Sequence, residues 1–156
     1  MLSSAFGTAP SPPFSERTQD HRCLRVLVVD DDSDSADSLM MLLEAFGHQV
    51  RVARDGPTAL ELACADVPEV MLVDIGLSGM DGCEVTRRVR RTPELRGVVL
   101  VAFTGYGRDE DRQRTLGAGF DLHLTKPVDP VDLRELLAHP VVLRKLLARR
   151  IGAVRP

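Results

Sequence analysis

Three short apolar runs in this chain each end in a charged residue, and this pattern constrains the fold more than any other feature. Asp30, Asp74 and Lys126 each come directly after such a run. Runs of about four to six aliphatic residues are typical of strands buried on both faces, as in a parallel sheet. Ligands bind at the carboxyl ends of the strands in such sheets. We therefore expect one pocket that holds several carboxylates and an ammonium group.

Segments with helical spacing separate the strand-like runs from residue 24 onward. We expect strands over 24–29, 48–53, 70–73, 97–103 and 120–124, and helices from a Ser33 N-cap to Gly47, from Pro57, through Val85 and Val89, over 108–116 and over 130–138. Strands that alternate with helices indicate right-handed crossovers and a parallel sheet covered on both faces. The sequence therefore predicts an α/β fold with a doubly wound, five-stranded parallel sheet.

The size and composition of the chain indicate one globular domain. Its 156 residues exceed the needs of one sizeable core and are too few for two typical domains. The apolar runs are far shorter than the ~20 residues that cross a bilayer, and we expect no membrane contact. The three cysteines show no CxxC spacing, which favours reduced thiols and a cytoplasmic location.

The two ends of the chain differ from its middle in composition. Residues 1–22 are rich in proline and serine, and we expect a flexible leader. Residues 139–156 carry five basic side chains and no acidic one, whereas the whole chain has a net charge of -3. This basic tail is long enough for a short amphipathic helix and too short for a DNA-binding domain. Four possibilities stay open for this tail. It can dock on an acidic partner, on its own domain or on nucleic acid, or it can be a solvated chain end.

The adjacent carboxylates of Asp30 and Asp31 have two interpretations. Burying them without a partner would be costly, and a hard cation such as Mg²⁺ relieves their repulsion because it prefers oxygen ligands. Alternatively, acidic residues cap a helix N-terminus, where they favour the helix dipole. We prefer the capping interpretation for Asp32, Asp34 and Asp37.

Three further residues gain meaning from their positions at strand ends. Asp74 can ligate a cation or act as a nucleophile, and Lys126 can reach a phosphoryl oxygen as a compact point charge. Thr104 adds a hydroxyl at the end of the fourth strand. Each residue alone also fits a structural role: a cap, a surface turn before Pro127, or an ordinary strand end.

In combination, these residues resemble the receiver domain of two-component response regulators. The motifs that carry the resemblance are Val-Leu-Val-Val-Asp-Asp-Asp at 26–32, Leu-Val-Asp-Ile at 72–75, Gly-Met-Asp-Gly at 79–82, Thr-Gly-Tyr-Gly at 104–107 and Leu-Thr-Lys-Pro at 124–127. The resemblance implies the flavodoxin-like strand order 2-1-3-4-5, and we assign residues 23–138 to this domain.

The resemblance also implies a function and a role for each site residue. A histidine kinase or a His-containing phosphotransfer protein would phosphorylate Asp74 in a Mg²⁺-dependent reaction. Lys126 would pair with Asp74 and then with the phosphoryl group, to which Thr104 would hydrogen-bond. The metal ligands would be Asp31 and Asp74 directly, Asp30 through water, and the carbonyl of Gly76. Such a domain is a switch rather than an enzyme, since it catalyses only its own phosphorylation and dephosphorylation.

Four residues near the predicted site are expected to affect how long the phosphoryl group persists and how its presence is transmitted. His123 replaces the aromatic residue that the family couples to Thr104, and it either fills the same space or biases the switch through its titration. Gly105 and Tyr106 would control access to the phosphoryl group, and we expect the Tyr106 ring to slow hydrolysis. Ser78 stands where the family usually has proline, which predicts a less rigid loop.

Alternatives to a single-domain switch stay open. The chain also fits the receiver module of a hybrid histidine kinase, or less well a phosphatase with an Asp74 nucleophile. We expect output through contacts with a downstream protein, and a homodimer stays open. Residues 108–116 contain Leu116 as their only large apolar residue, so we expect a helix of low local stability there.

Overall fold

The computed structural model describes residues 22–105, 109–139, 142 and 145, and their side chains except those of 109–112. Almost all of the predicted leader, Tyr106 and most of the basic tail lie outside the described residues. Within the described ranges, no helix is both long and apolar enough to cross a membrane.

The described residues form a five-stranded parallel sheet with the order β2-β1-β3-β4-β5, which confirms the predicted α/β fold and strand order. In chain order, the elements are β1 Arg25–Val29, α1 Ser33–Ala45, β2 Gln49–Ala53, α2 Gly56–Ala65, β3 Val70–Asp74, α3 Gly82–Arg91, the 3-10 helix η1 Pro93–Leu95, β4 Val99–Thr104, α4 Asp109–Ala118, β5 Leu122–Thr125 and α5 Pro130–Leu137.

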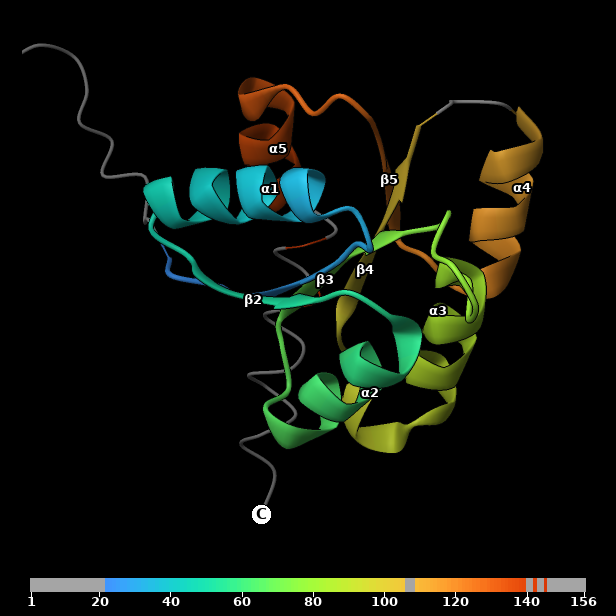
Figure 1. Ribbon diagram of the computed structural model, residues 1–156. Helices are drawn as coiled ribbons and strands as arrows, with labels where there is room; N and C mark the ends of the chain where they lie inside the picture. Colours follow the sequence, from blue (N-terminus) through green and yellow to red (C-terminus); the bar gives the residue numbers. More distant parts are fainter. Residues whose placement is uncertain (1–21, 106–108, 140–141, 143–144, 146–156) are drawn as a thin grey trace, which may run out of the picture.

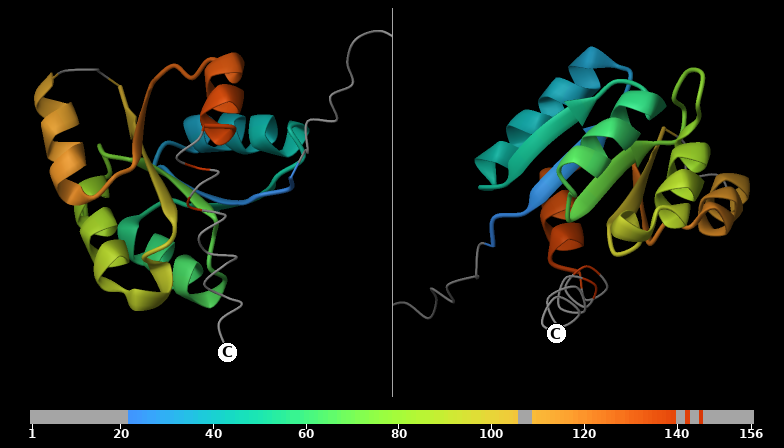
Figure 2. Two further views of the ribbon diagram at one scale, coloured as in Figure 1. Left: turned by 180° about the vertical axis from the view of Figure 1, so that it is seen from behind. Right: turned by 90° about the horizontal axis from the view of Figure 1, so that it is seen from below.

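Helices cover both faces of the sheet, with α1 and α5 on one side and α2, α3 and α4 on the other (Figures 1 and 2). Successive strand residues point to opposite faces. Val28 and Leu72 therefore join the core under α1 and α5, whereas Val29 and Val73 join the core under α2 and α3. Full burial of each such side chain contributes about 1.5–3 kcal/mol, which explains why β1 is apolar after Arg25 and why β3 and β4 are apolar up to Asp74 and Thr104.

Local chemistry shifts several predicted boundaries by a few residues. The N-cap of α1 is Asp32 and not Ser33, because the Asp32 carboxylate accepts a hydrogen bond from the Ser35 amide at 3.0 Å. Ser33 is the first residue of the helix. Phe120 is buried but precedes β5, since Gly119 turns the chain with a φ of 109°. The turn places the phenylalanine in the core before strand pairing begins.

Of the described side chains of helix α4, at residues 113–118, only those of small residues are buried. Leu116, its large apolar residue, is 71% exposed, and Thr115 and Ala118 are the buried positions among its described side chains. The local stability of this helix stays a prediction.

Two described residues of the basic tail contact the domain. Val142 is fully buried in the core under α1 and α5. Lys145 Nζ lies 2.5 Å from the Asp121 carboxylate, just before β5. The two described residues Val142 and Lys145 therefore pack against the chain's own domain, which is one of the four possibilities left open for the tail.

Candidate functional site

The parallel strands β1, β3, β4 and β5 run in the same direction through the sheet (Figure 1). The predicted site residues lie at the carboxyl ends of these four strands. Asp74 and Thr104 are the last residues of their strands, and Asp30 and Lys126 directly follow theirs. The Lys126 amide donates a 2.7 Å hydrogen bond to the Thr104 carbonyl, which continues the ladder past the end of β5. The register of the sheet therefore assembles residues that are up to 96 positions apart in the sequence.

Lys126 bridges two carboxylates. Its Nζ donates to Asp30 Oδ2 at 2.9 Å and to Asp74 Oδ2 at 3.1 Å. The ammonium also lies 5.1 Å from the centre of the Phe103 ring, whose π face favours a cation. The Lys126–Pro127 peptide bond is cis. These contacts hold the ammonium between the two acids. The resemblance implied the pairing of Lys126 with Asp74, whereas its contact with Asp30 was not predicted.

A third carboxylate makes the cluster strongly acidic. Asp30, Asp31 and Asp74 each offer an oxygen, and the three oxygens lie within 4.8 Å of one another. With one ammonium present, the ionised cluster has a formal charge of −2. Asp30 is buried and Asp31 is exposed, so the cluster opens to solvent on one side. Oxygen ligands, excess negative charge and access to water fit a hard divalent cation such as Mg²⁺.

The environment moves the pKa values of the cluster in different directions. Burial raises the pKa of Asp74, and the hydrogen bonds from Gly76 and Lys126 reduce this effect without cancelling it. Burial also opposes ionisation of Asp30, but hydrogen bonds from Lys126 and Ser35 outweigh it and lower the pKa of Asp30. Burial disfavours the Lys126 ammonium as well, yet its two carboxylate partners raise the pKa of Lys126. Contact with both carboxylates therefore favours the charged form of the Lys126 side chain.

The loop between β3 and α3 is fastened to the cluster at two points. The Gly76 amide donates to Asp74 Oδ1 at 2.8 Å, and Ser78 donates to Asp31. At Gly82, an added Cβ would lie 2.4 Å from the Asp74 carbonyl oxygen, so only glycine permits this close approach. The loop thus returns tightly to the end of β3. The role of the Gly76 carbonyl as a metal ligand stays a prediction.

The predicted switch residues Thr104 and His123 are hydrogen-bonded to each other. Thr104 Oγ1 and His123 Nε2 lie 2.8 Å apart, and Thr104 is 1% exposed. Gly105 follows at the surface, where an added Cβ would meet no atom of the described residues within 4 Å. Its role in access to the phosphoryl group stays a prediction. The access role predicted for Tyr106 falls outside the described residues.

Sequence reasoning missed three contributors to the site. Phe103 lies beneath the lysine, Ser35 supports the Asp30 carboxylate, and Ser78 binds Asp31. The alternation of β4 could have indicated Phe103, because it places residues 101 and 103 on one face. Ser78 reaches Asp31 across 47 positions of the sequence, and the contact of Ser35 with Asp30 depends on side-chain geometry. No local sequence pattern indicates either contact.

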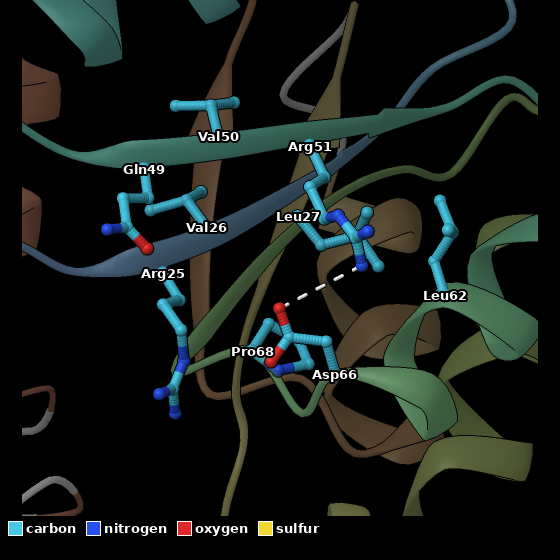
Figure 3. A pocket seen from close by; sticks show the side chains of 9 residues that line it. All are labelled: Arg25, Val26, Leu27, Gln49, Val50, Arg51, Leu62, Asp66 and Pro68. Atoms are coloured by element: carbon cyan, nitrogen blue, oxygen red, sulfur yellow. Dashed lines mark ion pairs between the residues drawn. The ribbon is translucent and has the colours of Figure 1, made fainter.

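Of two pockets on the described surface, one includes a residue of this cluster and the other does not. A groove of about 480 Å³ between α1 and the segment after β5 includes Lys126 among its lining residues, together with Leu39, Phe103 and Pro127. A smaller pocket of about 120 Å³ lies between β1, β2 and the end of α2 (Figure 3). It contains an exposed ion pair of 3.8 Å between Arg51 and Asp66 and none of the predicted site residues.

The chain is similar to known proteins across most of its described domain. The sequence profile of the response regulator receiver domain matches residues 26–138. The chain is 43% identical over 112 residues to the "Uncharacterized 14.6 kDa protein in sodA1 3'region" of Leptolyngbya boryana, covering 72% of this chain and 86% of that protein. It is 36% identical over 139 residues to the response regulator PleD of Caulobacter vibrioides, covering 83% of this chain but only 31% of PleD.

Solved structures share the fold. The chemotaxis protein CheY4 of Vibrio cholerae superposes with a TM-score of 0.72 at 26% identity, covering 75% of this chain and 98% of CheY4. The receiver domain of the sensor histidine kinase PA1611 from Pseudomonas aeruginosa gives a TM-score of 0.70 at 28% identity, covering 74% of this chain and 95% of that domain. That structure has a magnesium ion coordinated in its active-site cleft.

A doubly wound sheet with three carboxylates, a hydroxyl and one lysine at its carboxyl edge defines a receiver-type signalling domain. The chain belongs to the response regulator receiver domain family of two-component signal transduction.

Proposed function

We propose that this protein is a phosphorylation-dependent switch whose acceptor is Asp74. A histidine kinase or a His-containing phosphotransfer protein supplies the phosphoryl group, and the switched surface acts through contacts with a downstream protein in the cytoplasm. The observation that carries the proposal is the Lys126 ammonium, 3.1 Å from Asp74 and 2.9 Å from Asp30, inside a three-carboxylate cluster. A cation-and-anion site of this kind suits phosphoryl transfer, which depends mainly on positioning and charge neutralisation.

The proposed reaction is an in-line displacement at phosphorus. An oxygen of the Asp74 carboxylate forms the new O–P bond while the N–P bond to the phosphohistidine breaks, and the imidazole leaves with that electron pair. Burial raises the pKa of Asp74, which makes its carboxylate a somewhat better nucleophile. Lys126 is already in contact with the attacking group and can follow the charge onto the phosphoryl oxygens.

The residues present fit a magnesium ion. Asp31 and Asp74 would bind it directly, Asp30 through a water molecule and Gly76 through its carbonyl. Such an ion would neutralise the excess charge of the cluster and bind phosphoryl oxygens.

Thr104 and His123 form the proposed link from phosphorylation to the protein surface. The Thr104 hydroxyl has one proton to donate. Where this hydroxyl is the donor in the 2.8 Å interaction with His123 Nε2, a bond to the phosphoryl group takes that proton away from the imidazole, and the ring can then move relative to β5. The half-buried position of His123 allows such a change to reach the surface.

Incubation with a small phosphodonor tests the proposal. We expect one phosphoryl group per chain, trapped on Asp74 as an acyl phosphate, with Mg²⁺ present and not with EDTA. The Asp74→Asn variant should remain unlabelled. Rapid multiple turnover of phosphoesters without a stable phosphoprotein would instead support the phosphatase alternative.

A receiver module of a hybrid histidine kinase is a second candidate. The similarity to the PA1611 domain, which belongs to a sensor histidine kinase, favours it. Both candidates use the same Asp74 chemistry, so partner capture separates them. Pull-down with and without a phosphoryl mimic on Asp74 should recover a separate downstream protein if the chain acts as a free switch. The same samples, analysed for mass in solution, would show whether a homodimer forms.

A further inference from the structure

Ser78 directs two hydrogen bonds to a single oxygen of Asp31. The Ser78 amide donates to Asp31 Oδ2 at 3.1 Å, and the Ser78 hydroxyl donates to the same oxygen at 2.9 Å. The two residues are 47 positions apart, in the segments that follow β3 and β1. Because Asp31 is exposed, its carboxylate would otherwise be free to rotate in solvent.

The two bonds restrict the Asp31 carboxylate without using its second oxygen. Both donors contact Oδ2, and Asp31 offers one carboxylate oxygen to a cluster in which the oxygens of Asp30, Asp31 and Asp74 lie within 4.8 Å of one another. Donors on one oxygen of a ligating carboxylate fix its orientation and its mode of binding.

The same bonds fasten the loop that begins at Asp74. The Gly76 amide holds one end of this loop to Asp74, and Ser78 holds the next turn to Asp31. A proline at position 78 could make neither bond, since it has no amide hydrogen and no hydroxyl. The sequence predicted a looser loop in the absence of proline, whereas the structure shows an attachment that proline would remove.

We propose that Ser78 is a positioning residue for the divalent cation, which it serves by holding Asp31 and the β3–α3 loop in the cation-binding arrangement. The inference rests on the proposed metal site and adds a residue outside its ligand set. Loss of hydrogen bonds to metal ligands typically weakens metal binding by about 10- to 100-fold.

Direct measurement of cation binding by the full chain tests the inference. Calorimetry with Mg²⁺ and electron paramagnetic resonance with Mn²⁺ both report affinity without any phosphoryl transfer. Ser78→Ala keeps the amide donor and should weaken binding by about threefold, as expected for a single exposed hydrogen bond. Ser78→Pro removes both donors and should weaken binding by roughly 10-fold or more. Ser78→Thr keeps both donors and should restore the wild-type affinity.

Two controls separate positioning from a general loss of structure. Ser38→Ala removes an exposed hydroxyl from α1 and should bind Mg²⁺ like the wild type. Thermal unfolding without divalent cations should show each Ser78 variant folded at the binding temperature. If Ser78→Pro does not fold, the graded comparison of Ser78→Ala with Ser78→Thr still decides the matter.

Each outcome has a defined consequence. Unchanged or tighter binding in Ser78→Ala would overturn the inference, and tighter binding would mean that Ser78 competes with the cation for Asp31. In that case the wild type still binds Mg²⁺, and the proposed function stands. A wild type without saturable binding of Mg²⁺ or Mn²⁺ would overturn the proposed function together with the inference.

Discussion

Two clusters of charged residues lie at opposite ends of the sheet, and they differ in how fully their groups are paired. At the carboxyl ends of the strands, Lys126 is shared by Asp30 and Asp74, with Asp31 beside them. At the amino ends of β4 and β5, the Asp121 carboxylate pairs with the basic side chains of Arg90 and Lys145. The first end has excess negative charge, and the second has more positive than negative groups.

The cluster at the amino ends is saturated with hydrogen bonds. Arg90 donates to the carbonyls of Gly119, Arg96 and Val98 at 2.8–2.9 Å, and to Asp121 Oδ2 at 2.8 Å. These contacts join α3, the segment after η1 and the turn before β5. An arginine in this position fits a structural role because its fixed fork of donors is satisfied.

Asp121 is equally well satisfied. Its Oδ2 also accepts from the Leu100 amide at 2.9 Å, and its Oδ1 pairs with Lys145 of the tail. By contrast, the ionised carboxylates at the other end outnumber their ammonium partner. The balance of donors and acceptors, rather than the presence of charge, therefore distinguishes a site for chemistry from a structural joint.

The largest difference between the two clusters should appear in phosphorylation. Asp74→Asn removes the proposed nucleophile and should abolish labelling by a small phosphodonor. Asp121→Asn changes a carboxylate at the other end of the sheet and should leave labelling within about twofold of the wild type, once its folded fraction is matched. Intact-protein mass spectrometry measures both. Equal labelling of wild type and Asp74→Asn would place the acceptor elsewhere.

The saturated cluster should dominate stability. Arg90→Met leaves Asp121 without one of its cations and several backbone carbonyls without donors, so we expect a loss of about 3 kcal/mol in the free energy of unfolding. Urea unfolding followed by circular dichroism measures the change. A loss below about 1 kcal/mol would mean that solvent replaces these bonds cheaply and that the joint is not structural.

The unbalanced cluster should respond in the opposite direction. Asp74→Asn removes a carboxylate that burial disfavours, and it should raise the free energy of unfolding by about 1 kcal/mol at pH 7 without divalent cations. An acid whose folded pKa is raised destabilises the fold above that pKa, and the penalty vanishes as the pH falls through it toward 3.8. The gain should therefore disappear on acidification. A gain that persists at low pH would have another origin.

The smallest expected effect concerns the link between Thr104 and His123. Where the Thr104 hydroxyl donates to His123 Nε2, His123→Phe removes this competing acceptor and leaves the hydroxyl proton for the phosphoryl group. We expect beryllofluoride, a phosphoryl mimic, to bind about threefold more tightly, which corresponds to one modest hydrogen bond. Comparing wild type and variant from pH 6 to 8 also tests the titration hypothesis, which identical pH profiles would remove.

The fold and the central site residues were predictable because their signals are local. Each of Asp30, Asp74 and Lys126 directly follows an apolar run, and parallel strands bring such ends together. Spacing could not distinguish Ser33 from Asp32 as the N-cap, since both residue types cap helices and only the geometry decides.

Contacts between distant segments were not predictable from the sequence. The Ser78–Asp31 bonds, the Arg90–Asp121 joint and the burial of Val142 depend on how elements pack after the sheet has formed. Serine, aspartate and arginine are ordinary at exposed positions, so no pattern marks their contacts in advance. Val142 belongs to the apolar side of the possible tail helix, but that pattern does not specify the surface on which the residue packs.

The central claim is that the unbalanced cluster, and not the saturated one, binds a divalent cation. Titration of the isotopically labelled chain with Mg²⁺, followed by amide ¹H–¹⁵N spectra, tests it most directly. We expect saturable shifts centred on residues 30–31 and 74–78 and near Lys126, with residues 119–121 unaffected. The absence of saturable shifts, or shifts centred on Asp121, would contradict it.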